Sequence, residues 1–128
     1  MVVIDASATI ELLLNTTRAP AVIQATAGQR PSAPDLISIE VASTIRRLVR
    51  RGELTDERGA EAIADLGAMP LRLLPMRGLL EVVWSLRHNL SAYDAAYVAL
   101  ARALRCPLIT GDGRLARAPG LGVPTISA

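Results

Sequence analysis

Short apolar runs alternate along the chain with longer segments in which apolar residues recur every three or four positions. The short runs are typical of buried strands, and the wider spacing predicts amphipathic helices. The predicted strands cover residues 2–5, 32–33, 71–74, 107–110 and 123–126. The predicted helices cover residues 6–15, 21–27, 36–51, 56–67, 79–87, 91–105 and 112–117. This alternation favours an α/β sandwich with a mostly parallel sheet, because parallel neighbours need crossover connections.

Polar and glycine residues at the helix boundaries support these elements. Asp35 is expected to cap the helix over 36–51, and Gly52 is expected to end it. Thr55 is expected to cap the following helix. No repeat or linker interrupts the pattern, so residues 1–128 are expected to form a single domain.

Four carboxylates from distant parts of the chain are expected at one edge of this sheet. Asp5 ends one predicted strand and Asp112 lies two residues after another, and ligands of parallel sheets bind at the carboxyl ends of the strands. The helix beginning near residue 91 runs antiparallel to the strand after it, which brings Asp94 to the same edge. Glu40 lies near the start of its helix, roughly 7 Å along the axis at 1.5 Å per residue.

Each acid also has a purely structural explanation. Asp5 and Asp112 can cap the helices that follow them. Asp94 can complete a capping box with Ser91, and Glu40 can be a solvated helix residue. However, neither Glu40 nor Asp94 has an arginine three or four positions away. Carboxylates about 5 Å apart repel by roughly 3 kcal/mol at an effective dielectric constant of 20. Such a cluster needs protonation or a divalent cation, and oxygen ligands without His or Cys favour Mg²⁺ or Mn²⁺.

The composition is that of a globular chain, with 51% hydrophobic and 20% charged residues among 128. Charges interrupt every long apolar stretch, and the N-terminus does not resemble a secretion signal, so a cytoplasmic protein without a membrane segment is expected. Cys106 is the single cysteine and is expected to be a small buried side chain.

The basic residues exclude several reactions. All 14 are arginines. The lack of lysine argues against aspartate-nucleophile phosphatases and phosphorelay receivers, both of which place a lysine near their acids. His88 is the only histidine, so paired histidines cannot serve as acid and base, and a Ser–His–Asp triad would depend on that one residue.

Four motifs, in order, resemble those of a known family. They are VVIDAS at 2–7, PDLISIEVASTIRRLVRRG at 34–52, SAYDAAYVALA at 91–101 and LITGDGRL at 108–115. Across essentially the whole chain they resemble the PIN domain, specifically the VapC-type ribonuclease toxins of bacterial toxin–antitoxin pairs. The resemblance implies a three-layer α/β sandwich with a central, mostly parallel five-stranded sheet. It also implies metal-dependent endonucleolytic cleavage of RNA that leaves a 5′-phosphate and a 3′-hydroxyl.

The same resemblance implies particular residues and partners. The metal ion, Mg²⁺ or Mn²⁺, would be held by Asp5, Glu40, Asp94 and Asp112. The hydroxyl groups of Ser7 and Thr110 would support the site. Family members often carry a basic residue directly after the last acid, where this chain has Gly113 followed by Arg114. The expected partners are an RNA substrate, a VapB-type antitoxin and a second copy of the chain. The alternative is a catalytically inactive PIN-like module that binds RNA or a protein.

Candidate RNA-binding residues lie in RRLVRR at 46–51, namely Arg46, Arg47 and Arg50, with Arg114 near the last acid. Cations at a helix C-terminus also stabilise the helix, which is an equally good explanation for the cluster. Without the four acids the chain carries a net charge of +6, which attracts a polyanion. Aromatic residues make up only 2%, and both Tyr93 and Tyr97 are expected to pack in the core. A contact of Tyr93 with a base is the alternative.

Overall fold

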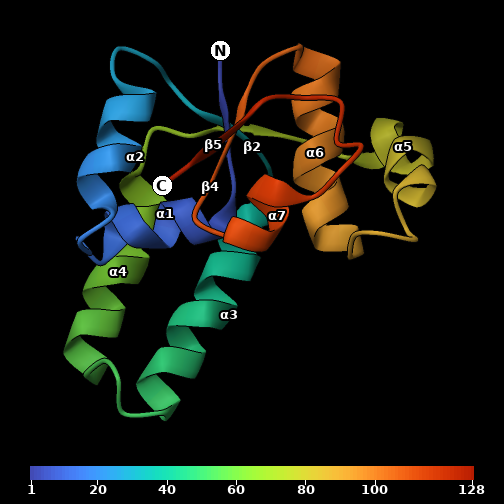
Figure 1. Ribbon diagram of the computed structural model, residues 1–128. Coiled ribbons are helices and arrows are strands. Elements are labelled where there is room, and N and C mark those ends of the chain that lie inside the picture. Colours follow the sequence, from blue (N-terminus) through green and yellow to red (C-terminus); the bar gives the residue numbers. More distant parts are fainter.

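The computed structural model describes all residues, 1–128, and contains a five-stranded sheet with the strand order β3-β2-β1-β4-β5 (Figure 1). Every neighbouring pair of strands is parallel. The strands are β1 (Val3–Ile4), β2 (Ser32–Pro34), β3 (Arg72–Leu74), β4 (Leu108–Thr110) and β5 (Thr125–Ser127). The expected parallel five-stranded sheet is therefore confirmed.

Helices connect the strands and cover the sheet. They are α1 (Ala6–Leu13), α2 (Ala19–Thr26), α3 (Ile37–Arg50), α4 (Asp56–Ala68), the 3₁₀ turn η1 (Arg77–Leu79), α5 (Leu80–Ser85), α6 (Ala92–Leu104) and α7 (Gly113–Arg117). In Figure 1, α1 and α2 lie on one side of the sheet, α6 lies on the other, and α5 packs outside α6. The helices α3 and α4 extend as a pair below the carboxyl ends of the strands (Figure 1). No helix is both long and apolar enough to span a membrane.

The topology places a ligand-binding edge between β1 and β4. The chain moves from β1 outward to β2 and β3, and then returns to the other side of β1 with β4. Val3 pairs with Leu108 and Ile4 with Ile109, so the two strands end at the same level. A reversal of strand order of this kind opens a crevice at the carboxyl ends of the strands.

The helix α6 is packed into the core next to this edge of the sheet. Seven consecutive residues, 95–101, are buried, because α6 packs on β1, β2 and β4 with one side and on α5 with the other. Four of the seven are alanines, which allow this close approach. Cys106 is buried and free, as expected. Asp94, at the start of α6, therefore has a fixed backbone position.

Most element boundaries differ from the expectation by one or two residues, and three of the differences have a local reason. Asp35 does not cap α3, because the helix begins two residues later, at Ile37, with Leu36 as its N-cap. The backbone N–H of Asp35 instead donates to the carbonyl of Leu74 and continues the pairing of β2 with β3. The helix α2 begins one residue before Pro20. The last strand lies two residues later than expected and begins at Thr125, after Pro124, which has no N–H to donate to the sheet.

Candidate active site: an acidic cavity at the carboxyl end of the sheet

The four sequence-predicted carboxylates line one cavity of about 270 Å³ at the carboxyl ends of β1 and β4. It is closed by the N-terminal parts of α1, α3 and α6. Its polar and charged lining residues are Asp5, Ser7, Glu40, Thr44, Arg47, Asp94, Tyr97 and Asp112. The geometry thus gathers Asp5, Glu40, Asp94 and Asp112 in one place, as expected from the ends of the strands and the directions of the helices. Of the candidate RNA-binding arginines, only Arg47 lines this cavity.

Asp5 has the most enclosed carboxylate of the four. It follows β1, is only 4% exposed, and caps α1 by accepting from the N–H of Ala8 at 2.9 Å. The hydroxyl of Ser7 donates to the same oxygen, Oδ1, at 2.7 Å. Burial raises the pKa of this carboxyl group, and the charge of Asp94 raises it further. Hydrogen bonds from Thr110, Ala8 and Ser7 act in the opposite direction and lower its pKa.

Ser7 and Thr110 join the ends of the two central strands. Ser7 Oγ accepts a hydrogen bond from the N–H of Gly111 at 2.8 Å while it donates to Asp5. Thr110 is fully buried, and its Oγ1 accepts from the N–H of Asp112 at 2.9 Å. The two hydroxyl oxygens lie 3.4 Å apart. These contacts fix the loop after β4 relative to the loop after β1.

Glu40 is held by a residue that the sequence had assigned to the core alone. The hydroxyl of Tyr97 donates to Glu40 Oε1 at 2.5 Å. Tyr97 is only 1% exposed and lies one helical turn after Asp94 on α6. Burial and the contact with Glu40 raise the pKa of Tyr97, which keeps the phenol protonated and able to donate. Tyr97 is therefore both a core residue and a part of the site.

Asp94 and Asp112 face each other across the outer part of the cavity. Burial raises the pKa of Asp94, and the charge of Asp112 raises it further, whereas the charge of Arg114 and a hydrogen bond from Ser91 lower it. Asp112 caps α7 by accepting from the N–H groups of Arg114 and Leu115. Arg114 Nη2 lies 3.8 Å from Asp112 Oδ2, but its side chain is 89% exposed, so this ion pair contributes little to stability.

The charge distribution favours a cation in the cavity. Burial raises the pKa of Glu40 above its usual range, the bond from Tyr97 lowers it, and the charges of Asp94 and Asp5 raise it again. Three of the four acids thus have a raised pKa with a like charge among its causes. A bound divalent ion would reverse this repulsion and favour the ionised carboxylates.

The residues fit a hard divalent cation by the type of donor, since only oxygen ligands meet in the cavity. No three of them are close enough in this structure to surround one ion. Like-charged oxygens about 4 Å apart repel by roughly 4 kcal/mol at an effective dielectric constant of 20, which favours the separated rotamers seen here. Asp94 and Asp112 are only partly buried, so their side chains can turn toward a bound ion.

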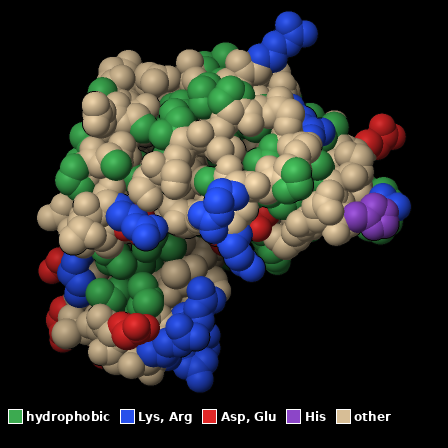
Figure 2. Space-filling view, in the orientation of Figure 1, with side chains coloured by type: hydrophobic (Ala, Val, Ile, Leu, Met, Phe, Trp, Pro, Cys, Tyr) green, Lys and Arg blue, Asp and Glu red, His purple; other side chains and the backbone are tan.

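The remaining sequence-predicted residues lie around the cavity. Arg46 and Arg50 line a separate hollow farther along α3, and Figure 2 shows basic side chains gathered over this lower part of the helix. Arg114 lines the outer hollow beside Asp94 and Asp112. Tyr93 is 61% exposed, so the expectation that it packs in the core is wrong. Tyr93 lies in the first turn of α6, before the buried run that begins at Ala95.

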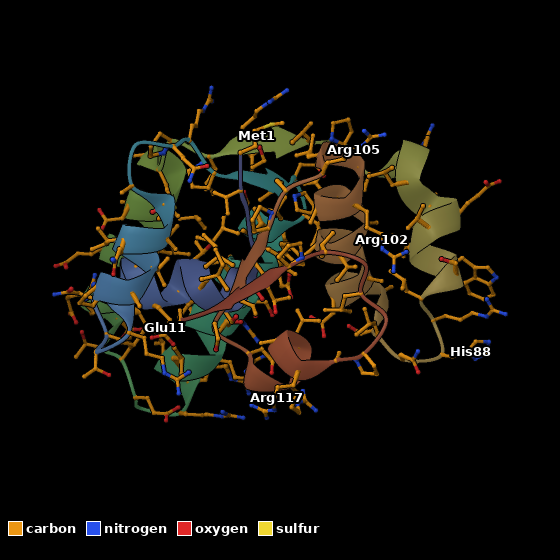
Figure 3. All side chains as sticks on the ribbon, turned by 45° about the horizontal axis from the view of Figure 1, so that its top comes forward. Met1, Glu11, His88, Arg102, Arg105 and Arg117 are labelled. Carbon is orange, nitrogen blue, oxygen red and sulfur yellow. The ribbon has the colours of Figure 1, made fainter.

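Two contacts at the site were missed by sequence reasoning. Tyr97 had a signal, because it is three positions after Asp94 and must share its helix face. Arg18 had none, since only the fold brings it to the rim, where Nη1 donates to the carbonyl of Gly111 at 3.2 Å. His88 lies at the outer end of α5, far from α1 and α7 (Figure 3), which removes it from any triad at this cavity.

The parallel sheet, its strand order and the carboxylates at the β1–β4 switch point define an α/β protein with an acidic site at one sheet edge. Residues 2–121 match the family model described as the PIN domain. The chain belongs to the PIN-domain family.

Known relatives place the chain more narrowly, among the VapC ribonucleases. It is 44% identical over 115 residues to the VapC ribonuclease Mb0985 of Mycobacterium bovis, covering 90% of this chain and 88% of the relative. The fold matches VapC20 of Mycobacterium tuberculosis, described as a toxin that cleaves the sarcin-ricin loop, with a TM-score of 0.69, 19% identity and coverage of 96% and 98%. It also matches a chain of VapBC2 from Rickettsia felis, solved with a promoter DNA fragment, with a TM-score of 0.67, 9% identity and coverage of 99% and 98%.

Proposed function

We propose that this protein is the toxin of a toxin–antitoxin pair and hydrolyses RNA phosphodiester bonds as a metal-dependent endoribonuclease. One observation carries the proposal: four carboxylates, with no lysine or histidine among them, line one cavity at the switch point of the sheet. The ribonuclease names of close relatives support the class of reaction. The continuous hydrophobic core supports treating residues 1–128 as one catalytic domain.

The proposed ligands of the ion are Asp5, Asp94 and Asp112, with Glu40 binding directly or through water. Mg²⁺ is the expected cofactor, and Mn²⁺ is the expected substitute. When bound, such an ion supplies charge that polarises a phosphate group and lowers the pKa of a water molecule. The chain's own contribution is to fix the ligands, since Ser7 orients Asp5 and Tyr97 orients Glu40. Buried hydrogen bonds of this kind keep ligand oxygens in place without reorganisation during the reaction.

The RNA backbone is proposed to cross the cavity and continue along α3. Arg47 lines the acidic cavity and also the hollow that contains Arg46, Arg50 and Arg51. Arg114 offers a second contact on the opposite side of the acids. Arginine forks bind phosphate oxygens in pairs, so these residues can position the strand without reading its sequence.

The proposed partners are a VapB-type antitoxin and a second copy of the chain. A basic segment of the antitoxin, with an arginine in the acidic cavity, would neutralise the same carboxylates as the metal ion. The VapBC2 assembly with the same fold supports this type of partner. For the homodimer, Leu80 and Trp84 on α5 offer an apolar surface, at 57% and 67% exposed. A cytoplasmic location is proposed because the substrate is RNA.

The test is cleavage of end-labelled total RNA by the purified protein in Mg²⁺, in Mn²⁺ and in EDTA, with the cut ends sequenced. Discrete cuts are expected only with a metal ion, and Asp94→Asn should lower the rate by more than about 10³-fold. The matched control is Asp65→Asn, which changes an exposed acid on α4 and should cut as the wild type does.

The alternative is a module that binds RNA or a protein without cutting. Absence of cutting in either metal ion by folded, antitoxin-free protein would favour this alternative. Growth arrest that persists in cells expressing Asp94→Asn would favour it as well. The complete set of four acids in one cavity speaks for the enzyme.

A further inference from the structure

The arginine surface is the hollow lined by Ser43, Arg46, Arg47, Arg50 and Arg51. A further hollow on α3 connects it with the acidic cavity. This middle hollow encloses about 420 Å³, a size that is ordinary for small-molecule sites. It shares Glu40 and Thr44 with the acidic cavity, and it shares Ser43 with the arginine surface. Arg47 lines all three hollows. A strand bound along this groove would therefore pass the middle hollow directly beside the acids.

The walls of the middle hollow are apolar and one of them is aromatic. Ile39 from α3 and Leu36, the residue before it begins, line the hollow together with Tyr93 from the first turn of α6. Ile39 is 75% exposed and Tyr93 is 61% exposed, and the phenol of Tyr93 makes no hydrogen bond within the chain. The side chains of Ile39 and Tyr93 are thus exposed to water next to a charged site. Phosphate binding would need only the arginines, so these exposed apolar side chains indicate a different kind of contact.

We propose that this middle hollow, the base site, binds one unpaired nucleobase of the RNA next to the phosphate in the acidic cavity. The inference rests on the function proposed above and adds a contact that can read sequence. The base would stack on Tyr93 with Leu36 and Ile39 beside it, in the manner by which proteins bind splayed-out RNA bases. Hydrogen-bonding groups at its edge are the hydroxyls of Ser43 and Thr44 and the guanidinium of Arg47.

The lining favours a nucleotide over a second copy of the chain as the occupant. A subunit contact would bury the carboxylate of Glu40 and the guanidinium of Arg47, which is costly unless both are paired. A nucleotide would not bury these groups unpaired, because its phosphate binds at the acidic cavity and its base edge can bind Arg47. Arg47 is also held at the boundary, since its Nη2 donates to Thr44 Oγ1 at 3.4 Å.

The experiment compares binding of two ligands by fluorescence anisotropy: a short labelled single-stranded RNA of mixed sequence, and an abasic ribose–phosphate chain of the same length. All variants carry Asp94→Asn and are measured in Mg²⁺, so that cleavage does not interfere. The protein with Tyr93 is expected to prefer the RNA with bases by about 5- to 100-fold. Tyr93→Ala should remove this preference without changing the affinity for the abasic chain. Tyr93→Phe, which keeps a ring, should restore most of it.

Ile23→Ala serves as the matched control, since it removes an exposed apolar side chain on α2, outside the groove. It should keep the full preference. A Tyr93→Ala variant that still prefers bases, or that loses affinity for both ligands equally, would overturn the base site. So would a change in molecular mass of Tyr93→Ala by light scattering, because Tyr93 would then belong to a subunit interface.

The same samples separate this inference from the proposed function. Wild-type protein that cuts total RNA in Mg²⁺ but shows no preference for bases would leave the nuclease intact and overturn the base site alone. Protein that neither cuts RNA nor binds either ligand would overturn both. Tyr93→Ala can also be made without Asp94→Asn, so that the protein still cuts RNA. If the bases flanking its cuts differ from those of the wild type, this would independently support the base site.

Discussion

The acidic cavity and the arginine surface of α3 lie next to each other but are built in opposite ways. Asp5 is 4% exposed and accepts hydrogen bonds from Ser7 and Ala8, among others, and Glu40 accepts one from a buried tyrosine. Arg46, Arg50 and Arg51, by contrast, are exposed and make no side-chain hydrogen bond or ion pair. In the acidic cavity, hydrogen bonds hold individual carboxylates in defined positions. On the arginine surface, no such contacts fix the guanidinium groups.

This difference follows from what each region has to bind. Ligands of a small cation must stay within a few tenths of an ångström, so each oxygen needs neighbours that fix it. Phosphates on a flexible strand can be met by any of several long side chains, and each contact is weak and screened by salt. Substitutions in the cavity should therefore have large effects that do not add, whereas those on α3 should be small and additive.

The largest effect is expected from the cation itself. The raised pKa of Asp5, Glu40 and Asp94 means that the folded state favours their protonated forms, so stability without metal falls as the pH rises through and above their ordinary range. At neutral pH, Mg²⁺ at 100 times its Kd should add about 2.7 kcal/mol, or roughly 10 °C in Tm. Thermal unfolding followed by circular dichroism, with and without Mg²⁺, measures this rise.

Asp5→Asn sharpens that measurement. The amide oxygen can still accept from Ala8 and Ser7, so the cap of α1 is kept while the charge is lost. Without metal the variant should be at least as stable as the wild type at neutral pH, and it should lose most of the rise in Tm. An equal rise in both proteins would place the cation elsewhere.

Ser7→Ala should have the next largest effect, because Ser7 serves both strand ends. The substitution removes a donor from Asp5 and leaves the N–H of Gly111 without its acceptor. Loss of such a supporting contact typically costs 10- to 100-fold in metal affinity. Titration of Mn²⁺ by calorimetry measures it, with Ser85→Ala as the control because the hydroxyl of Ser85 contacts only its own helix. An unchanged Mn²⁺ affinity would limit Ser7 to a structural role.

The sequence predicted the acidic cavity better than its surroundings, and the reason is geometric. Asp5 and Asp112 follow strands, so the parallel sheet alone determines which edge they share. Contacts such as Arg18 with Gly111 depend on how a loop packs across the sheet, which no local pattern encodes. Asp35 failed as a cap because its backbone N–H still pairs with β3, so α3 begins only at Ile37 with Leu36 as its N-cap.

Tyr93 was misplaced because helical periodicity tells which residues share a face but not where the neighbouring layer ends. Tyr93 and Tyr97 are one turn apart on α6 and both flank Asp94, yet Tyr93 is 61% exposed and Tyr97 is 1% exposed. The sheet covers α6 only from residue 95 onward. Burial at a helix end is therefore decided by tertiary structure.

Tyr97→Phe should have a smaller effect than Ser7→Ala, since one contact is lost and the ring still fills the core. The carboxylate of Glu40 would keep its position on α3 but lose its only side-chain donor. The expected result is about a tenfold loss of Mn²⁺ affinity. A double-mutant cycle with Glu40→Gln measures the coupling between the two residues. Their losses of Mn²⁺ affinity should not add, because the two side chains are in contact. Additive losses would assign Tyr97 to packing alone.

The smallest effects are expected on the arginine surface. Arg46→Gln with Arg50→Gln should weaken RNA binding a few-fold and make the plot of log affinity against log salt shallower by about 1.4, at 0.7 per phosphate contact with a single strand. The control is Arg77→Gln, which removes an exposed arginine from η1.

The salt slope also separates the two roles of these arginines. Near the end of α3 each charge stabilises the helix by about 0.3–1 kcal/mol, so a lower Tm is expected whether or not RNA binds there. Glutamine is a good helix former, which keeps the loss of stability small. The slope responds only to phosphate contacts. A lower Tm with an unchanged slope would therefore mean that Arg46 and Arg50 stabilise the end of α3 and do not contact phosphates. RNA binding would then be confined to the rest of the groove.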